Sequence, residues 1–199
     1  MNHIGIGRIE DEKRRRVLEG ATKVFLAYGY NRTTMDDIAR AAEMSRPALY
    51  LLFRNKSDIY RVLASGFFEE SMALTREALG GGGAFAERMN AMVDKSMIAL
   101  IETIMASPHG AEILGAKDSL AADLAKDWCT RISETVAEAI DTEADQRGVD
   151  LAGRGLSAQT LADLFCDAME GMKSRIDDIP AMRARAHTLV RLIERALAA

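Results

Sequence analysis

Apolar residues recur at helical spacing along almost the whole chain. The first stripe, in residues 10–28, consists of Val17, Leu18, Ala21, Val24, Phe25 and Tyr28. Gly29 follows and is a natural C-terminal stop for this helix. Proline occurs only three times, and long stretches are rich in Ala, Leu, Met, Glu and Arg, which favour helix over strand. The sequence therefore predicts an all-α protein.

Two short helices are predicted next, separated by a tight turn. The first begins at a threonine pair, where Thr33 with Asp36 or Thr34 with Asp37 has the pattern of a capping box. Ser45 is a good N-cap for the second short helix. Three helices of about 19, 9 and 8 residues, with a tight turn between the last two, match a DNA-reading helix-turn-helix.

Longer stripes predict the remaining helices, for a total of about nine. Their approximate ranges are 56–79, 85–106, 118–147, 158–176 and 181–198, with a short segment around residue 112 between the second and third. Four consecutive glycines at 80–83 end the first of them, and Pro180 separates the last two.

Charge is distributed unevenly along the chain, whose formal net charge is −4. Residues 1–63 hold 12 Lys and Arg against 8 Asp and Glu, a balance of +4, whereas residues 64–199 hold 14 against 22, a balance of −8. We therefore expect only the N-terminal part to meet a polyanion such as DNA. A solvated basic face is the plain alternative.

Several classes of protein are disfavoured. No apolar run approaches the ~20 residues that span a bilayer, and the first nine residues lack a secretory signal, so we expect a cytoplasmic protein without membrane contact. Cys129 and Cys166 lack metal-ligand spacing and are expected to be reduced, buried thiols. His3, His109 and His187 lie far apart, outside any hydrolase, metalloprotease or P-loop motif. We expect no enzyme, catalytic residue, metal or cofactor.

The segment TTMDDIARAAEMSRPALYLLFRNKSDIY, residues 33–60, resembles the DNA-binding segment of the TetR family of transcriptional regulators, which are AcrR-like helix-turn-helix repressors. The family pattern is a paired Thr or Ser, Ile-Ala, Ala-Gly-Val-Ser, Leu-Tyr, two residues and Phe, then a Lys that opens the next helix. The matching positions are Thr33 and Thr34, Ile38 and Ala39, Ala42 to Ser45, Leu49 and Tyr50, Phe53 and Lys56. The resemblance implies a homodimer that binds a palindromic double-stranded DNA operator.

Four residues are expected to bind DNA phosphates. Thr33 and Thr34 cap a helix N-terminus, where free backbone N–H groups and hydroxyls can hold a phosphate oxygen, or they form an ordinary cap. Tyr50 is similar to the family's phosphate-binding tyrosine, although an aromatic residue there could instead belong to the core. Lys56 resembles the family's phosphate-binding lysine, and its alternative is a solvated surface position.

Ser45, Arg46, Pro47 and Ala48 form the early part of the expected recognition helix, which faces the major groove. Arg46 can pair bidentately with guanine, and Ala48 can touch a thymine methyl group. Two positions depart from the family pattern: Glu43 and Pro47 stand where the family prefers glycine. Glu43 would be strained at a positive φ, so we expect the turn to be built differently. Pro47 places rigid apolar bulk at the base edges.

Beyond residue 60 the resemblance is one of architecture. Family members carry six further helices, with a ligand cavity among the middle ones and a four-helix dimer interface formed by the last two. The residues that could line an apolar pocket for a small-molecule effector, or could be plain core, are Phe68, Met72, Met89, Met92, Trp128, Phe165 and Met169. The stripes of the last two helices predict a homodimer, with Phe165 and Leu189 in its interface.

These features divide the chain into a helix-turn-helix DNA-binding domain, residues 1–55, and a ligand-binding and dimerisation domain, residues 56–199. The expected function is a DNA-binding regulator, a repressor released by a small molecule, with activation left open. The alternative is a helical protein-interaction or acyl-ligand carrier domain whose helix-turn-helix is purely structural. Such a domain would show no salt-dependent DNA binding.

Overall fold

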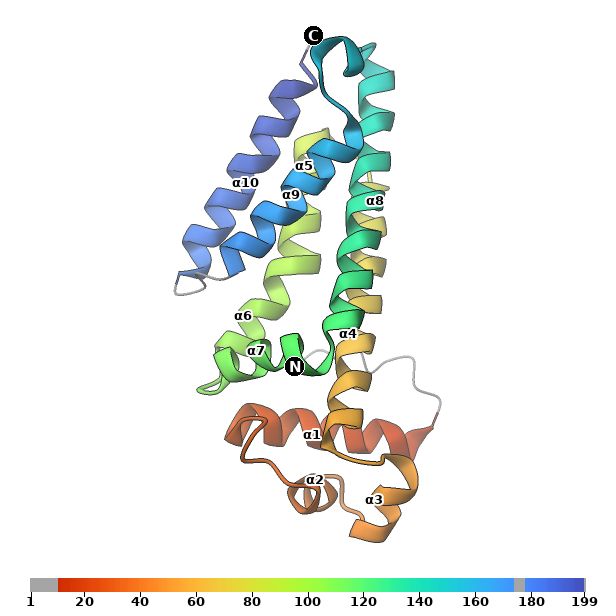
Figure 1. Ribbon diagram of the computed structural model, residues 1–199, viewed down its shortest axis with the longest axis vertical. Helices are drawn as coiled ribbons and strands as arrows, with labels where there is room; N and C mark the ends of the chain where they lie inside the picture. Colours follow the sequence, from red (N-terminus) through yellow and green to blue (C-terminus); the bar gives the residue numbers. More distant parts are fainter. Residues whose placement is uncertain (1–10, 174–177, 199) are drawn as a thin grey trace. The chain divides into compact units, whose positions relative to one another are not determined.

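A computed structural model describes residues 11–173 and 178–198, and in these residues the chain is built from helices alone (Figure 1). The helices are α1 (Glu12–Tyr28), α2 (Met35–Ala41), α3 (Arg46–Leu52), α4 (Lys56–Leu79), α5 (Phe85–Met92), α6 (Ala99–Met105), α7 (Gly110–Leu120), α8 (Ala122–Arg147), α9 (Ala158–Lys173) and α10 (Ile179–Ala196). A π-helical turn, Val93–Ile98, joins α5 to α6 without a break, and Ala152–Arg154 form a 3-10 turn. The all-α prediction is confirmed.

The helices pack into two compact units. The N-terminal unit contains residues 11–70 and 100–126, and the C-terminal unit contains the described residues of 71–99 and 127–199. Each unit thus combines segments that are distant in the sequence. No helix among the described residues is long and apolar enough to cross a membrane.

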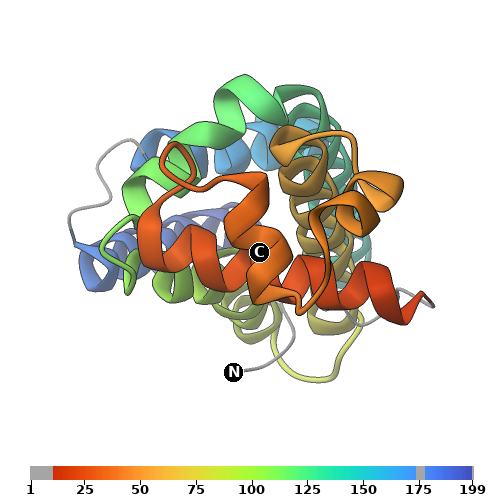
Figure 2. The same cartoon turned by 90° about the horizontal axis from the view of Figure 1, so that it is seen from below.

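The core of the N-terminal unit lies where α1, α2, α3 and the start of α4 meet (Figures 1 and 2). Its large, fully buried side chains are Leu18, Ile38, Leu49, Phe53 and Ile59. Gly20 lets α1 approach the end of α2 closely, because a Cβ there would lie 2.9 Å from the Ala42 nitrogen. Any larger residue at position 20 would push these two helices apart.

The segment near residue 112 forms a complete helix, α7, so the predicted helix from residue 118 is wrong in its start. The chain bends at Ala121, which is fully buried, and α8 begins at Ala122. Glycines at positions 110 and 115 lower the helix propensity of this segment. The sequence pattern therefore does not predict a full helix here. Gly110 is required by packing, because a Cβ there would collide with the backbone of Ile104 and Met105.

The last two helices are confirmed with shifted ends. The described part of α9 stops at Lys173, and the predicted extension to residue 176 lies outside the described residues. The final helix begins earlier than predicted, at Ile179, because the Asp178 carboxylate accepts a hydrogen bond from the Ala181 amide at 2.9 Å. Pro180 lies in the first turn of α10. Backbone N–H groups in the first turn of a helix make no hydrogen bond within the helix, so the proline, which lacks this group, costs no bond there.

The turn between α2 and α3 places Glu43 at a φ of 54°, the one positive value at a non-glycine residue in the part of the chain that is described. The turn is therefore built with the left-handed conformation, and the expectation of a different turn is wrong. Glu43 is exposed, so no buried contact compensates its strain. The cost of a side chain in this region is roughly 1 kcal/mol.

We therefore expect Glu43→Gly to raise the free energy of unfolding by about 0.5–1 kcal/mol, since glycine removes the Cβ clash but also gains freedom in the unfolded chain. Urea denaturation followed by circular dichroism measures it. Glu43→Ala retains the Cβ and serves as the control, with almost no change expected. An equal gain in both variants would attribute the effect to the carboxylate and not to the backbone.

Candidate nucleic-acid interface

The N-terminus of α2 is closed by a capping box, and of the two predicted pairs it is Thr34 with Asp37 that forms it. The Thr34 amide donates to the Asp37 carboxylate at 2.9 Å, and the Asp37 amide donates to the Thr34 hydroxyl oxygen at 3.2 Å. The hydrogen bond from the Thr34 hydroxyl, followed by that from its amide, lowers the pKa of Asp37. Thr34 is exposed, so its hydroxyl stands at the surface beside the first turn of the helix.

Thr33 has a different role from its neighbour. Its side chain is buried, and its hydroxyl donates to the Gly29 carbonyl at 2.6 Å. This bond holds the loop between α1 and α2. The Thr33 hydroxyl is therefore buried and already engaged, and it is not open to a phosphate from solvent.

One face of helix α3 is exposed to solvent, and it carries both polar and apolar side chains. Ser45 caps it, accepting a hydrogen bond from the Ala48 amide at 3.3 Å, and Pro47 lies in its first turn. The exposed side chains on this helix are Arg46, Pro47, Tyr50 and Leu51, whereas Ala48 is half-buried. Leu51, which sequence reasoning did not single out, is 88% exposed. Leu49, by contrast, lies in the core as expected for the opposite face.

Arg46 and Tyr50 lie side by side on this exposed face. The Arg46 guanidinium carbon is 5.7 Å from the centre of the Tyr50 ring, and its Nη1 is 3.7 Å from the Asp36 carboxylate. Tyr50 is 43% exposed, which rules out the alternative that it belongs to the core. An exposed ion pair of this length contributes little stability, so Arg46 can exchange Asp36 for another partner at small cost.

The Lys56 ammonium group lies inside the N-terminal unit and not on an open surface. It donates to the carbonyls of Tyr30 at 2.6 Å, Thr33 at 2.8 Å and Asn31 at 3.3 Å. It also lies 4.3 Å from the centre of the Tyr30 ring. Burial lowers the pKa of Lys56, and the negative charge of Glu112 partly opposes this. Its three N–H groups thus hold the loop between α1 and α2 against the start of α4.

Three aromatic rings extend this contact into the core. The Tyr30 ring centre is 5.5 Å from those of both Phe25 and Tyr60, and the Tyr30 hydroxyl is 2.8 Å from the Ser57 hydroxyl. Burial raises the pKa of Tyr60 to about 12, and its hydroxyl donates to the Ile113 carbonyl at 2.8 Å. The aromatic cluster therefore links α1, α4 and α7.

The α6–α7 corner and the first turn of α7 are bonded to α1 and to the loop that follows it. The Asn31 amide donates to the Glu112 carboxylate at 2.6 Å, and the Ser107 hydroxyl donates to the Leu26 carbonyl at 2.7 Å. These contacts join residues 81 positions apart, so no local sequence pattern could reveal them. They make α6 and α7 part of the body that carries α2 and α3.

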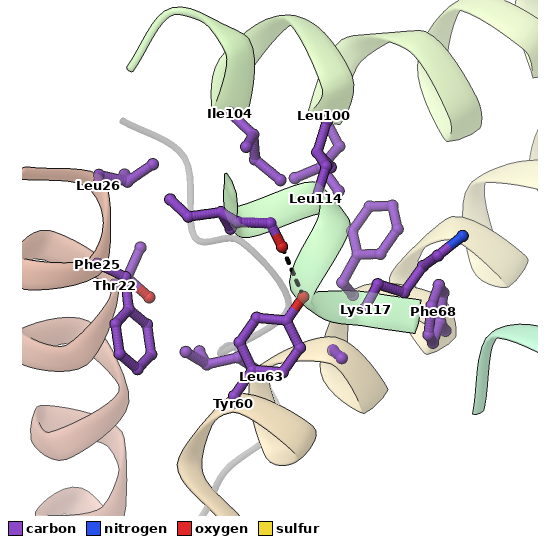
Figure 3. Close-up of a pocket in the computed structure, with 13 residues that line it drawn as sticks. Thr22, Phe25, Leu26, Tyr60, Leu63, Phe68, Leu100, Ile104, Leu114 and Lys117 are labelled. Carbon is purple, nitrogen blue, oxygen red and sulfur yellow. Dashed lines mark hydrogen bonds between the residues drawn. The ribbon is translucent and has the colours of Figure 1, made fainter. Parts of the chain in front are cut away.

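An apolar cavity of about 130 Å³ lies within the N-terminal unit, between α1, α4, α6 and α7 (Figure 3). Its lining residues are Thr22, Phe25, Leu26, Tyr60, Leu63, Ala64, Phe67, Phe68, Leu100, Ile104, Ile113, Leu114 and Lys117. Of the residues predicted to bind a ligand, Phe68 is brought to this cavity.

The other predicted ligand residues lie in the C-terminal unit and fill its interior. All six are buried: Met72, Met89, Met92, Trp128, Phe165 and Met169. The Trp128 indole N–H is satisfied by the Ser71 hydroxyl at 3.1 Å. The structure therefore describes these side chains as packed core and places none of them at the cavity of the N-terminal unit.

Comparison with known proteins connects this geometry to a family. Residues 17–63, which span most of α1 and all of α2 and α3, match the model of the bacterial regulatory proteins of the TetR family. This segment of the chain is similar to the DNA-binding part of the TetR-family regulators. The chain is a DNA-binding transcriptional regulator and not an enzyme, as the sequence predicts.

Relatives named as helix-turn-helix regulators support this conclusion, and solved structures of TetR-family regulators share the fold. The chain is 25% identical to the transcriptional repressor Rv1474c of Mycobacterium tuberculosis over 82% of each chain. It is 29% identical to the uncharacterised regulator YhgD of Bacillus subtilis, a match that spans 46% of each protein. The TetR-family regulator PfmR of Thermus thermophilus has the same fold, with a TM-score of 0.62 at 21% identity over 88% of this chain and 97% of that one.

We expect Lys56→Met to lower the free energy of unfolding by about 2 kcal/mol, because methionine retains the apolar stem but leaves three partly buried carbonyls without their charged donor. Chemical denaturation measures the loss. Lys23→Met, at an exposed position of α1, is the matched control and should change stability by less than about 0.5 kcal/mol. Equal losses in the two variants would show that water replaces the ammonium group at these carbonyls.

Proposed function

We propose that this protein is a TetR-family repressor that binds a palindromic operator as a homodimer and is released by a small molecule. The observation that carries the proposal is the exposed face of α3, where a capped helix presents Arg46, Pro47 and Tyr50 to solvent. The relative Rv1474c is named a repressor, which supports repression over activation. We assign DNA binding to residues 1–55, sensing and dimerisation to residues 56–199, and action to the cytoplasm, where the DNA is.

In this proposal, α3 supplies the contacts to bases, and both α2 and α3 supply contacts to phosphates. Arg46 can leave Asp36 and pair with guanine N7 and O6, while Pro47 and the half-buried Ala48 offer apolar contacts to thymine methyl groups. Thr34, at the α2 N-terminus, and Tyr50, beside Arg46, are placed for phosphate oxygens. Ser45 and Lys56 support the interface indirectly, through the N-cap and the loop contacts.

The dimer interface that we propose follows an exposed apolar stripe on α9 and α10. Leu164 is 57% exposed and Leu192 is 62% exposed, and half-buried Leu161 and Leu189 lie one turn away from them. A two-fold axis would pair this stripe with its copy as a four-helix bundle. Phe165 is fully buried within its own chain, so its predicted place in the interface is replaced by Leu164.

We expect Arg46→Ala to weaken operator binding by ~1–3 kcal/mol and to relax base preference at one position of each half-site. The operator is first located by footprinting DNA upstream of the protein's own gene, and affinity is then titrated against the site and single-base variants. Arg76→Ala, at an exposed position of α4 in the C-terminal unit, is the control with unchanged affinity. An Arg46→Ala protein that keeps its affinity and preference would remove base readout from this residue.

We expect Leu164→Glu and Leu192→Glu to give monomers in light scattering, since a carboxylate in the bundle would lose its hydration. Their operator affinity should fall steeply, because one half-site supplies about half of the contacts. Leu51→Glu changes a leucine on α3 that is even more exposed, and it should leave the protein dimeric. A monomeric wild type at micromolar concentration would contradict the proposed assembly.

A further inference from the structure

We propose that the effector is an uncharged, largely apolar molecule the size of a single ring, and that it binds in the cavity between α1, α4, α6 and α7. The inference rests on the proposed function, because it names the ligand that releases the operator. It differs from the site expected from the sequence, because one wall of this cavity is α1 of the DNA-binding domain itself.

The volume of the cavity suits a small ligand. An enclosed apolar space of about 150 Å³ is enough to hold benzene in a protein interior, and this cavity is of similar volume, about 130 Å³. A single aromatic or alicyclic ring with a short substituent fits.

The lining sets the chemistry of the ligand. Two of its hydroxyls are already engaged inside the protein: that of Thr22 donates to the Leu18 carbonyl at 2.9 Å, and that of Tyr60 donates to the Ile113 carbonyl. The side-chain nitrogen of Lys117 points away from Phe25 and Leu26 in Figure 3. A carboxylate placed against Phe25 and Leu26 would lose its hydration without a directed donor at that end of the cavity, which favours an uncharged ligand there.

The same walls connect the cavity to the DNA-binding surface. Phe25 and Tyr60 line it, and both rings contact Tyr30, whose carbonyl and ring hold the Lys56 ammonium group. A ring inserted against Phe25 and Tyr60 displaces this cluster, and with it the loop that leads into α2. Ligand binding thus changes the position of the helix-turn-helix through contacts within one compact unit.

Toluene is the probe, with benzoate as its charged counterpart. We expect the wild-type protein to bind toluene, and toluene to lower operator affinity at least tenfold in fluorescence anisotropy. Ala64→Met fills the cavity from α4 and should weaken toluene binding at least tenfold and abolish its effect on the operator. Ala73→Met makes the same change at an exposed position of α4 and should behave as the wild type.

A second variant, Ile104→Phe, fills the cavity from the α6 side. It replaces Ala64→Met if circular dichroism shows that Ala64→Met is unfolded. Toluene binding that survives in a folded filling variant, or benzoate binding tighter than toluene, would overturn the inference. Operator affinity that toluene leaves unchanged would overturn it as well. A protein that binds no operator in the absence of toluene would instead overturn the proposed function.

Discussion

The arrangement of α1, α2 and α3 depends on one ammonium group. Lys56, the first residue of α4, satisfies three carbonyls of the loop between α1 and α2, and this loop sets where α2 begins. Because α3 follows α2 after a short turn, the exposed residues of α3 take their position from the same contact. Tyr30 adds a cation–π contact, and Glu112 adds a hydrogen bond to the loop from α7. Lys56 therefore positions the exposed face of α3 that we propose for DNA binding.

Local interactions explain why the first four helices are predictable from the sequence. Their stripes, the Ser45 cap and the glycine after α1 act within a few residues, and each agrees with the fold. The choice between Thr33 and Thr34 as the cap was open, because both pairs have the required spacing. Burial of the Thr33 side chain decides it, and burial depends on packing between helices.

The rest of the site depends on contacts between distant residues. The Asn31–Glu112 and Tyr60–Ile113 hydrogen bonds bring α7 to the N-terminal unit, and α7 itself has too weak an apolar pattern to be located beforehand. For the same reason the sequence pattern predicts methionines such as Met89 as cavity residues, whereas these large apolar side chains fill the core. An apolar stripe alone does not distinguish a packed side chain from the wall of a cavity.

Gly20 has a consequence for the dynamics of α1 and α2. Its backbone lies so close to the Ala41–Ala42 backbone that α1 and the end of α2 cannot separate without exposing the core between them. Local opening of α2 alone would leave Ile38 and Leu18 in water. The amide hydrogens of both helices should then exchange with solvent through the same opening event, so that α1 and α2 act as one cooperative unit of unfolding.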